Sequence, residues 1–206
     1  IDDTIAFIDN VYIPDLLAIA GFYKDWAAIG GGLSSKYLMS YGDLPIKAND
    51  YSPGNLMMPR GAIVDGNLNE IQDIDLDALD QVQKGLHPFD GETVPNFDIG
   101  GAKGTKTRIE AVDESAKYSW VKSPRWKGHA MEVGPLARYV IGYVKGIPEF
   151  KDPTDMVLAK LGGVPVTALF STLGRTAARG LECSWAAHKL KDEFNKLIAS
   201  IRAGDT

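Results

Sequence analysis

The segment from Tyr118 to Arg138 holds the densest group of side chains that could do chemistry. It reads YSWVKSPRWKGHAMEVGPLAR and mixes aromatic residues, proline, glycine and charges of both signs. We interpret it as an extended stretch that turns into a helix, with Glu132 in or just before the first turn, where the helix dipole favours a carboxylate. Lys122, Arg125 and Arg138 are candidate partners. Composition favours a buried ion-pair network over a catalytic role for these groups.

A second charged group lies on a helix predicted near the C-terminal end. Arg175 and Arg179 are four residues apart, and Glu182 follows three residues later. At this spacing one helix face carries two cations and an anion. We interpret the group as an interhelical or intersubunit ion pair, with an anion-binding site as the alternative.

The chain is poor in metal ligands. It has one cysteine, Cys183, and three histidines: His87, His129 and His188. A single cysteine cannot form an internal disulfide or supply a cysteine-rich zinc or iron–sulfur site. Apolar neighbours favour a small buried role for Cys183. We predict no metal ligand and no catalytic residue within these 206 residues.

Length and composition restrict the class of protein. The chain has 206 residues, 22 Lys and Arg against 27 Asp and Glu, and a formal net charge of -5. Such a chain folds without disulfide or metal support. Its mild acidity argues against a nucleic-acid partner, for which a basic stripe is expected. We see no leader at Ile1 and no apolar run of roughly 18 residues, so we expect a soluble piece of a longer chain.

Residues 1–32 are predicted to be helical. Apolar residues recur at intervals of three and four between Asp3 and Trp26, which is the period of one helical face. Pro14 lies inside this run and lacks a backbone donor. It predicts either a kink or two helices, with Pro14 in the first turn of the second.

Residues 33–117 are predicted to form an insert of loops and short strands. Tyr37–Met39 and Ala62–Val64 are short apolar runs typical of strands, and Asp65–Gly66 is a hairpin-type turn. Glycine and proline between residues 84 and 107 predict an irregular, ordered loop. Gly100–Thr107 lacks the spacing of a phosphate-binding loop, so a surface turn is favoured there over a nucleotide site.

Residues 118–206 combine the charged segment with long helices. We predict helices over Met131–Tyr143, Asp155–Leu161 and Val166–Ile201, the last ending before Gly204. The longest would reach about 50 Å, more than a small independent domain needs. The predicted fold is therefore mainly α, with short β-hairpins, and the long helix belongs in a large bundle.

The segment Tyr118–Arg138 resembles the central signature of the large subunit of [NiFe] hydrogenases of the membrane-bound uptake type. Other stretches agree in order and spacing: FIDNVYIPDLLAIAG from Phe7, LMSYGD from Leu38, HPFDG from His87, and STLGRTAAR from Ser171. The resemblance covers nearly the whole chain. It implies the central helical bundle of that subunit, with a loop-rich insert, and a part in the reversible oxidation of H2.

The resemblance places the cofactors outside these residues. In the family, four cysteine thiolates from two Cys-x-x-Cys motifs hold a Ni–Fe centre with CO and CN ligands, and neither motif occurs here. The full subunit also holds a structural magnesium ion. Lys122 and Glu132 are then candidates for a buried polar network behind the active site, near the ligands of that magnesium.

The resemblance also implies partners and a location. The partners are an iron–sulfur small subunit that carries the clusters and, through the complex, a membrane cytochrome b. The location is the periplasmic face of the cytoplasmic membrane, with the cytoplasm as the alternative. A non-catalytic or hydrogen-sensing relative, or a scaffold or interaction module of the same fold, is the alternative function.

The chain departs from the family pattern between Gln83 and Lys84. An additional stretch rich in aromatic residues, with a His-x-Trp-Tyr-like element, is expected there but is missing. Either the protein has lost this stretch, or the numbering closes over residues that were left out. A Cα separation near 3.8 Å would indicate a continuous chain.

Overall fold

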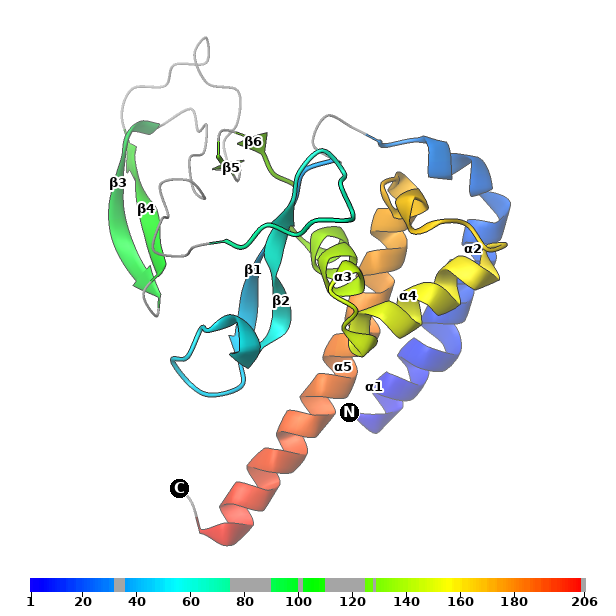
Figure 1. The fold of residues 1–206 in the computed structure, drawn as a ribbon. Helices are drawn as coiled ribbons and strands as arrows, with labels where there is room; N and C mark the ends of the chain where they lie inside the picture. The colour runs from blue at the N-terminus through cyan, green and yellow to red at the C-terminus, as the bar shows by residue number, and fades with distance from the viewer. Residues whose placement is uncertain (32–35, 75–89, 100–101, 110–124, 128, 205–206) are drawn as a thin grey trace. The chain divides into compact units, whose positions relative to one another are not determined.

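The computed structural model describes residues 1–31, 36–74, 90–99, 102–109, 125–127 and 129–204 (Figure 1). The chain divides into two compact units. Unit 1 consists of Ile1–Gly31 and Gly146–Thr206, and unit 2 of Gly32–Lys145. The fold is mainly helical with short β-hairpins, which confirms the predicted fold class. The predicted boundaries of the loop-rich insert, after residues 32 and 117, stay a prediction.

The N-terminal part of unit 1 is a nearly continuous helical run. It consists of α1 (Asp2–Phe7), a π-helical turn η1 (Ile8–Tyr12), α2 (Ile13–Phe22) and a 3₁₀ turn η2 (Lys24–Ala28). Pro14 lies in the first turn of α2. Of the two alternatives, a kink or two helices, the structure shows the second: α2 begins at Ile13 with Pro14 in its first turn. The π-helical turn η1 joins α2 to α1 without a break.

The expectation that no apolar run is long enough to cross a membrane is wrong for this helical run. Residues Asp2–Phe22 form a helix of 21 residues that is long and apolar enough to cross a membrane, and little of its most apolar part is buried. Asp9, Pro14 and Asp15 interrupt the apolar residues in the sequence, but all of these residues lie in one continuous helical run. These criteria of length and composition do not by themselves identify a membrane span, because a core helix of a larger protein meets them too.

Helix α4 (Pro148–Lys160) begins earlier than the predicted Asp155. A proline at its N-terminal end favours initiation, because the missing N–H would have no intrahelical partner there. Pro153 lies inside the helix, and the buried Thr154 donates from Oγ1 to the Phe150 carbonyl at 2.7 Å. Phe150 is fully buried and its ring lies 6.1 Å from that of Trp185.

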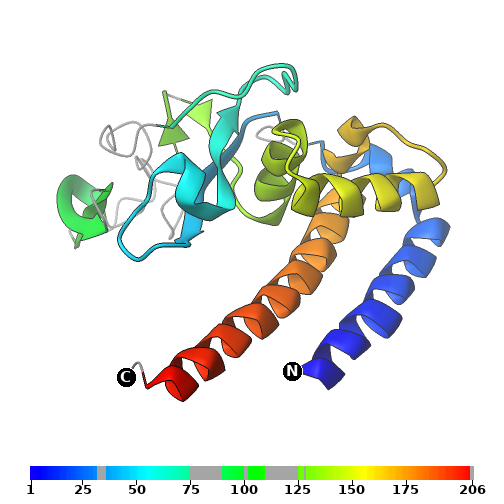
Figure 2. The ribbon, with the colours of Figure 1, turned by 60° about the horizontal axis from the view of Figure 1, so that its bottom comes forward.

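The longest helix, α5, spans Thr172–Ala203, and a 3₁₀ turn η5 (Val166–Leu169) precedes it. The predicted single helix from Val166 is therefore interrupted before Ser171. Ser171 caps α5, because its Oγ accepts a hydrogen bond from the Gly174 N–H at 3.0 Å. Gly204 ends the helix in the left-handed conformation, as the sequence predicts. Figure 2 shows α5 running alongside α1 within unit 1.

Unit 2 contains the antiparallel pair β1 (Leu38–Pro45) and β2 (Leu56–Ile63), with the 3₁₀ turn η3 (Pro53–Asn55) between them. Both predicted strands exist. Asp65 and Gly66 have positive φ and form a turn, but the chain returns only at Gln72, which bridges to Ala62. A hydrophobic core cluster of unit 2 consists of the buried residues Met39, Ala62, Ile74, Trp126 and Met131.

Among its described residues, the rest of unit 2 forms two further antiparallel strand pairs and the helix α3. Strands β3 (Asp90–Ile99) and β4 (Ala102–Ile109) pair antiparallel, so the irregular loop predicted for residues 84–107 is wrong over these ranges. Register shifts fall between Asp90 and Thr93 and between Pro95 and Phe97, and such bulges accommodate glycine and proline. Strands β5 (Arg125–Trp126) and β6 (His129–Ala130) form the other hairpin. Helix α3 (Pro135–Val144) packs on β1 and β2.

Candidate functional site

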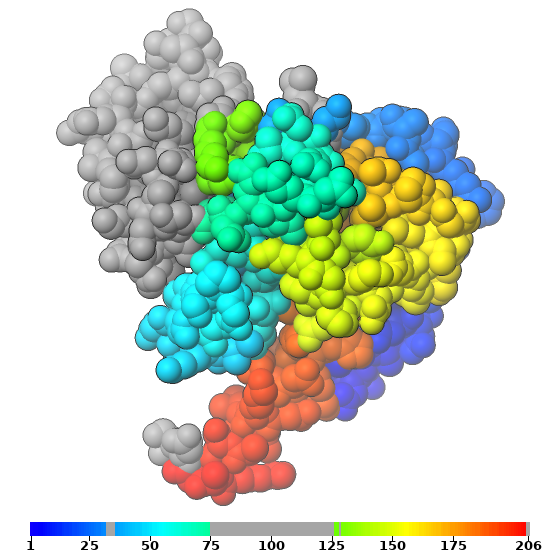
Figure 3. All heavy atoms as spheres, viewed as in Figure 1, coloured from blue at the N-terminus to red at the C-terminus, as the bar shows by residue number. Residues whose placement is uncertain are grey.

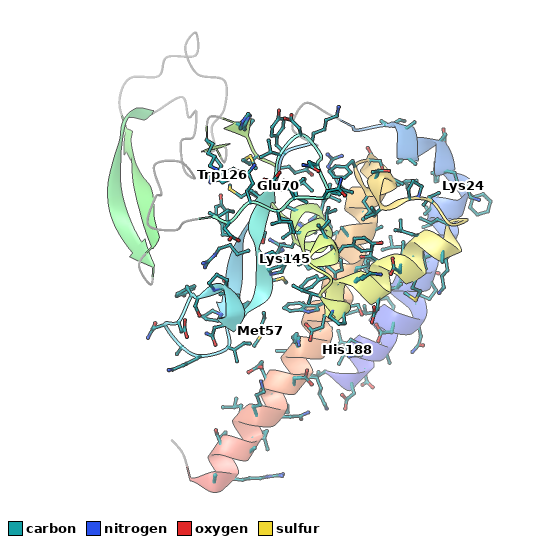
Figure 4. All side chains as sticks on the ribbon, in the orientation of Figure 1. Lys24, Met57, Glu70, Trp126, Lys145 and His188 are labelled. Atoms are coloured by element: carbon teal, nitrogen blue, oxygen red, sulfur yellow. The ribbon has the colours of Figure 1, made fainter. Side chains whose placement is uncertain are left out.

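The described part of the charged segment, Arg125–Arg138, is fixed to the core of unit 2 through Trp126. This side chain is 2% exposed and lies in the apolar core (Figure 4). The Lys127 ammonium lies 4.3 Å from the centre of the Trp126 ring and donates to Gln72 Oε1 at 3.0 Å. A cation over a tryptophan face is attracted by the electrons of the ring. The hairpin β5–β6 is thus held by packing on one side and by a cation on the other.

The backbone of Glu132 adds a short parallel bridge to β1. Its N–H donates to the Tyr37 carbonyl at 2.7 Å, and its carbonyl accepts from the Met39 N–H at 2.8 Å. Gly134 has φ 111° and precedes α3, whose first residue is Pro135. The helix predicted to begin at Met131 therefore begins at Pro135, because Glu132 forms a bridge with Leu38 of β1 instead. Glu132 lies just before the first turn, as predicted.

Arg138 is in the first turn of α3, where its N–H donates to the Gly134 carbonyl at 3.1 Å. Glu132 and Arg138 are both half-buried. The structure thus places both residues on one short stretch around the start of α3. Lys122 and the Gln83–Lys84 junction lie outside the described residues, as does His87, and for Arg125 the structure gives the backbone alone.

His129 and Tyr37 form a stacked pair on unit 2. Their ring centres are 4.7 Å apart, with an angle of 16° between the planes. The Tyr37 hydroxyl donates to the Asp65 carboxylate, and this hydrogen bond raises the pKa of Tyr37. The stacking gives His129 a structural partner on unit 2.

The second predicted group lies on α5 of unit 1. Arg175 donates from Nη1 to the Gly30 carbonyl at 2.5 Å, and the Thr172 N–H donates to the Ile29 carbonyl at 2.9 Å. Arg175 and Glu182 are half-buried, whereas Arg179 is exposed. Arg175 therefore ties the start of α5 to the end of the N-terminal helical run.

A polar cluster that the sequence analysis missed joins Asp9 to α5. Asp9 lies in the π-helical turn, and it accepts hydrogen bonds from Ser184 Oγ at 2.8 Å and from His188 Nε2 at 2.8 Å. Ser184 and His188 are four residues apart, so they share a helix face. The sequence could have indicated that Ser184 and His188 share a helix face, but it gives no sign that Asp9 lies next to them.

A second missed cluster joins α4 to α5. The Glu149 carboxylate accepts from Lys189 Nζ at 2.8 Å and from Trp185 Nε1 at 3.2 Å. The hydrogen bond from Lys189 is the largest cause of a lowered pKa of Glu149, and burial opposes it. Both clusters link helices by hydrogen bonds and charge, and neither has the geometry of an acid–base pair around a cavity.

The described residues do not fit a metal centre. Among them, no three His, Cys, Asp or Glu side chains group together. Cys183 is exposed, so the expectation that it is buried is wrong. A single exposed thiol cannot hold a nickel ion that prefers several thiolates.

Comparison with known proteins decides the family. The family model described as nickel-dependent hydrogenase matches residues 1–206, the whole chain. This chain belongs to the nickel-dependent hydrogenase family. The resemblance of the segment Tyr118–Arg138 to the hydrogenase large subunit is thereby confirmed.

Curated relatives refine the assignment within the nickel-dependent hydrogenases. The uptake hydrogenase large subunit of Rhizobium leguminosarum bv. viciae is 57% identical over 221 residues, which cover 100% of this chain and 37% of that protein. The hydrogenase-1 large chain of Escherichia coli (strain K12) is 43% identical, over 98% of this chain and 36% of that one. The chain thus spans about 37% of the length of the curated relatives it matches.

A solved hydrogenase supports the fold. A [NiFeSe] hydrogenase variant from Desulfovibrio vulgaris Hildenborough is 25% identical, with a TM-score of 0.67, over 93% of this chain and 38% of that one. The alignment with the Rhizobium protein extends over 221 positions, whereas this chain has 206 residues. That relative therefore has residues inside the matched range that are missing here. Their place between Gln83 and Lys84 stays a prediction.

Proposed function

We propose that this chain acts as the central part of a hydrogenase large subunit that oxidises H2 to protons and electrons. The family match over residues 1–206 carries the proposal, and the 57% identity to an uptake hydrogenase large subunit supports the uptake direction. The described residues contain no metal-binding group. The role assigned to this part is therefore to support a reaction centre whose ligands lie elsewhere in the subunit.

The cofactors and partners follow from the same assignment. A Ni–Fe centre with CO and CN ligands and a structural magnesium ion would lie in the rest of the subunit, and iron–sulfur clusters in a small subunit. The term large subunit in the names of the relatives supports such a partner. Electrons would leave the complex through a membrane cytochrome b. The word uptake supports a place at the periplasmic face of the cytoplasmic membrane rather than in the cytoplasm.

The test uses the full-length large subunit produced with its small subunit. Nickel and iron are measured in the purified complex, together with H2-dependent reduction of a dye. We expect nickel in the complex and dye reduction that requires H2. A nickel-free complex that reduces no dye would instead favour a non-catalytic scaffold, and a complex that binds H2 without turnover would favour a hydrogen-sensing relative.

We further propose that Glu132, with Lys122, Arg125 and Arg138, belongs to a polar network behind the reaction centre. Glu132 is half-buried, and two backbone hydrogen bonds fix its main chain to β1. Groups that orient metal ligands typically change activity by 10- to 100-fold, so we expect Glu132→Gln to lower H2 oxidation by about tenfold. The exposed Glu70 offers a matched control in the same unit.

The readouts separate a positioning role from a folding defect. Glu132→Gln should leave the yield of the complex unchanged while lowering its magnesium occupancy or its turnover, and Glu70→Gln should change none of these. If Glu132→Gln left both activity and assembly untouched, the role assigned to Glu132 would be wrong.

A further inference from the structure

Arg60 is a buried cation in the strand pair β1–β2 of unit 2. It lies on β2 opposite Tyr41 of β1 and is 8% exposed. Burial lowers the pKa of its guanidinium, because the charged form loses contact with water. An arginine nevertheless stays charged in proteins, so the hairpin holds a positive charge away from solvent. Such a charge is unfavourable unless hydrogen bonds and an anion compensate for it.

Two main-chain carbonyls hold the guanidinium in one orientation. Its Nε–H donates to the Tyr41 carbonyl at 2.6 Å, and Nη2 donates to the Tyr51 carbonyl at 2.7 Å. Gly42 has a φ of 77°, and a methyl group on it would lie 3.3 Å from Arg60 Nε and 2.4 Å from Leu56 Cδ1. The glycine therefore leaves room for the guanidinium against the main chain of β1.

The guanidinium keeps donors that these carbonyls do not use. Two of the five N–H groups of Arg60 donate to Tyr41 and Tyr51, which leaves three without a partner in the part of the chain that the structure describes. The three are both N–H groups of Nη1 and one of Nη2. Nη1 and Nη2 are neighbours on one planar group, and such a pair of donors matches the two oxygens of a carboxylate.

The carboxylates of the same hairpin bind elsewhere. Asp43 Oδ1 accepts from the Leu44 N–H at 2.7 Å, and Asp50 Oδ1 accepts from the Ser52 N–H at 3.0 Å. A hydrogen bond from the Ser52 side chain is the largest cause of the lowered pKa of Asp50. Among the described residues, no carboxylate pairs with Arg60. The hairpin thus supplies the cation and the donors, but not the anion.

The loop that carries the Tyr51 carbonyl is already ordered. Asn55 Nδ2 donates to the carbonyls of Lys47 at 3.1 Å and Asp50 at 2.7 Å. The Asn55 carbonyl accepts from the Ile46 N–H at 2.8 Å. Figure 3 shows atoms of this part of the hairpin, drawn in light blue to cyan, on the surface of unit 2. An ordered loop loses little conformational entropy when a ligand binds, which favours affinity.

We propose that Arg60 binds a small carboxylate anion from solution, with Nη1 and Nη2 donating to its two oxygens. An arginine that is 8% exposed meets solvent over a small area, which suits a ligand of a few atoms better than a protein surface. The Tyr41 and Tyr51 carbonyls keep the donors in position, and the bound anion in turn fixes the loop through Tyr51. This binding is separate from H2 oxidation.

Hydrogen exchange tests the site in the full-length large subunit assembled with its small subunit. Acetate is the probe, and chloride keeps the ionic strength constant, because charge interactions depend on salt. Exchange through local opening slows by the factor 1 + [L]/Kd, so acetate at about ten times its Kd should slow exchange of the amides in residues 46–55 about tenfold. Unchanged exchange in this loop would overturn the proposal, as would slowing only in other parts of the complex.

Three variants connect the effect to the guanidinium. Arg60→Gln removes the charge and should abolish the slowing by acetate. Arg60→Lys keeps the charge without the planar pair of donors, so it should weaken acetate binding by about tenfold or more. Arg202 is exposed on α5, and Arg202→Gln is the control that should keep the full effect. Equal slowing in Arg60→Gln and the unmodified complex would overturn the proposal.

The experiment also distinguishes the source of the carboxylate. If an acidic side chain of the assembled complex already fills the site, acetate will not slow exchange in the unmodified complex, and the proposal of a free anion is wrong. The unmodified complex and Arg60→Lys decide the question even if Arg60→Gln does not assemble. No readout requires H2 oxidation, so the proposal can fail while the proposed function holds.

Discussion

A methyl group on Gly174 would lie 2.1 Å from the carbonyl oxygen of Leu169. The chain turns back on itself between η5 and α5, so the backbone of η5 lies against the first turn of the helix. A backbone atom cannot move aside as the end of a side chain can. Only glycine therefore fits at position 174.

The same helix offers a second glycine with a different neighbour. A methyl group on Gly180 would lie 2.6 Å from Leu16 Cδ1, the end of a flexible side chain. Gly174→Ala should therefore destabilise the full complex by about 2 kcal/mol or more, as overpacking does. Gly180→Ala should change stability by less than about 1 kcal/mol, because the helix propensity gained offsets the contact. Thermal unfolding of both variants measures the difference. Equal shifts in Tm would show that the close approach of the Leu169 carbonyl does not exclude a methyl group at position 174.

The N-cap of α5 gives a second prediction. Ser171 is 1% exposed; its Oγ accepts from the Gly174 N–H and donates to the Ala168 carbonyl at 2.7 Å. Ser171→Ala removes both hydrogen bonds and should cost about 1 to 2 kcal/mol of stability. The exposed Thr176 donates to the Thr172 carbonyl within the helix, so Thr176→Ala serves as the control and should cost under about 0.5 kcal/mol. The denaturant midpoints of unfolding of the two variants test this prediction. A smaller loss of stability for Ser171→Ala than for Thr176→Ala would show that the Ser171 cap does not stabilise α5.

Local signals in the sequence predicted the parts of the fold that depend on neighbouring residues. The start of α2 next to Pro14 and the end of α5 at Gly204 follow from the backbone chemistry of proline and glycine. The break before Ser171 was missed because it depends on the close approach of Leu169 to Gly174. The strand pair β3–β4 was missed because its glycines and proline argue against a strand in the sequence. Bulges in β3 allow these residues to lie within the pair.

The site could be predicted only where its contacts are local. Glu132 was placed just before a helix from the sequence, but its pairing with β1 joins residues about a hundred positions apart. Asp9 and His188 are separated by 179 positions, and no periodicity indicates that they meet. Tertiary packing decides such contacts, and the sequence alone carries no signal for them.

The Glu149–Lys189 pair gives a prediction about pH. The pKa of Glu149 is lowered in the folded protein, so the carboxylate contributes stability above its unfolded pKa near 4.5, and this is lost as pH falls through the lower folded pKa. Its side chain is 49% exposed, so solvent screening keeps the contribution below about 1 kcal/mol. Glu149→Gln should therefore lower Tm at pH 7, and the difference from the unmodified protein should shrink under acidic conditions.

A double-mutant cycle with Lys189→Gln isolates the pair. The hydrogen bond from Trp185 Nε1 stays available to a glutamine at position 149, so the cycle reports mainly on the charge interaction. The effect of Glu149→Gln should be smaller in the Lys189→Gln background. A Tm difference that is independent of pH, or unchanged by the second substitution, would refute the role of the charge.

Gly134 gives a prediction that separates backbone strain from packing. Its φ of 111° and ψ of -162° belong to a region that glycine alone occupies readily, and an added Cβ would have no neighbour within 4 Å. Gly134→Ala should therefore destabilise the complex by about 1 to 3 kcal/mol although there is room for the methyl group. Gly54 also has open space around it, without a positive φ, so Gly54→Ala is the control and should have little effect. Since Gly134 lies between the bridge at Glu132 and the start of α3, strain there should also lower H2 oxidation in the assembled enzyme. Unfolding and dye reduction measured on both variants test this, and a stable, fully active Gly134→Ala enzyme would show that this turn does not set the position of Glu132.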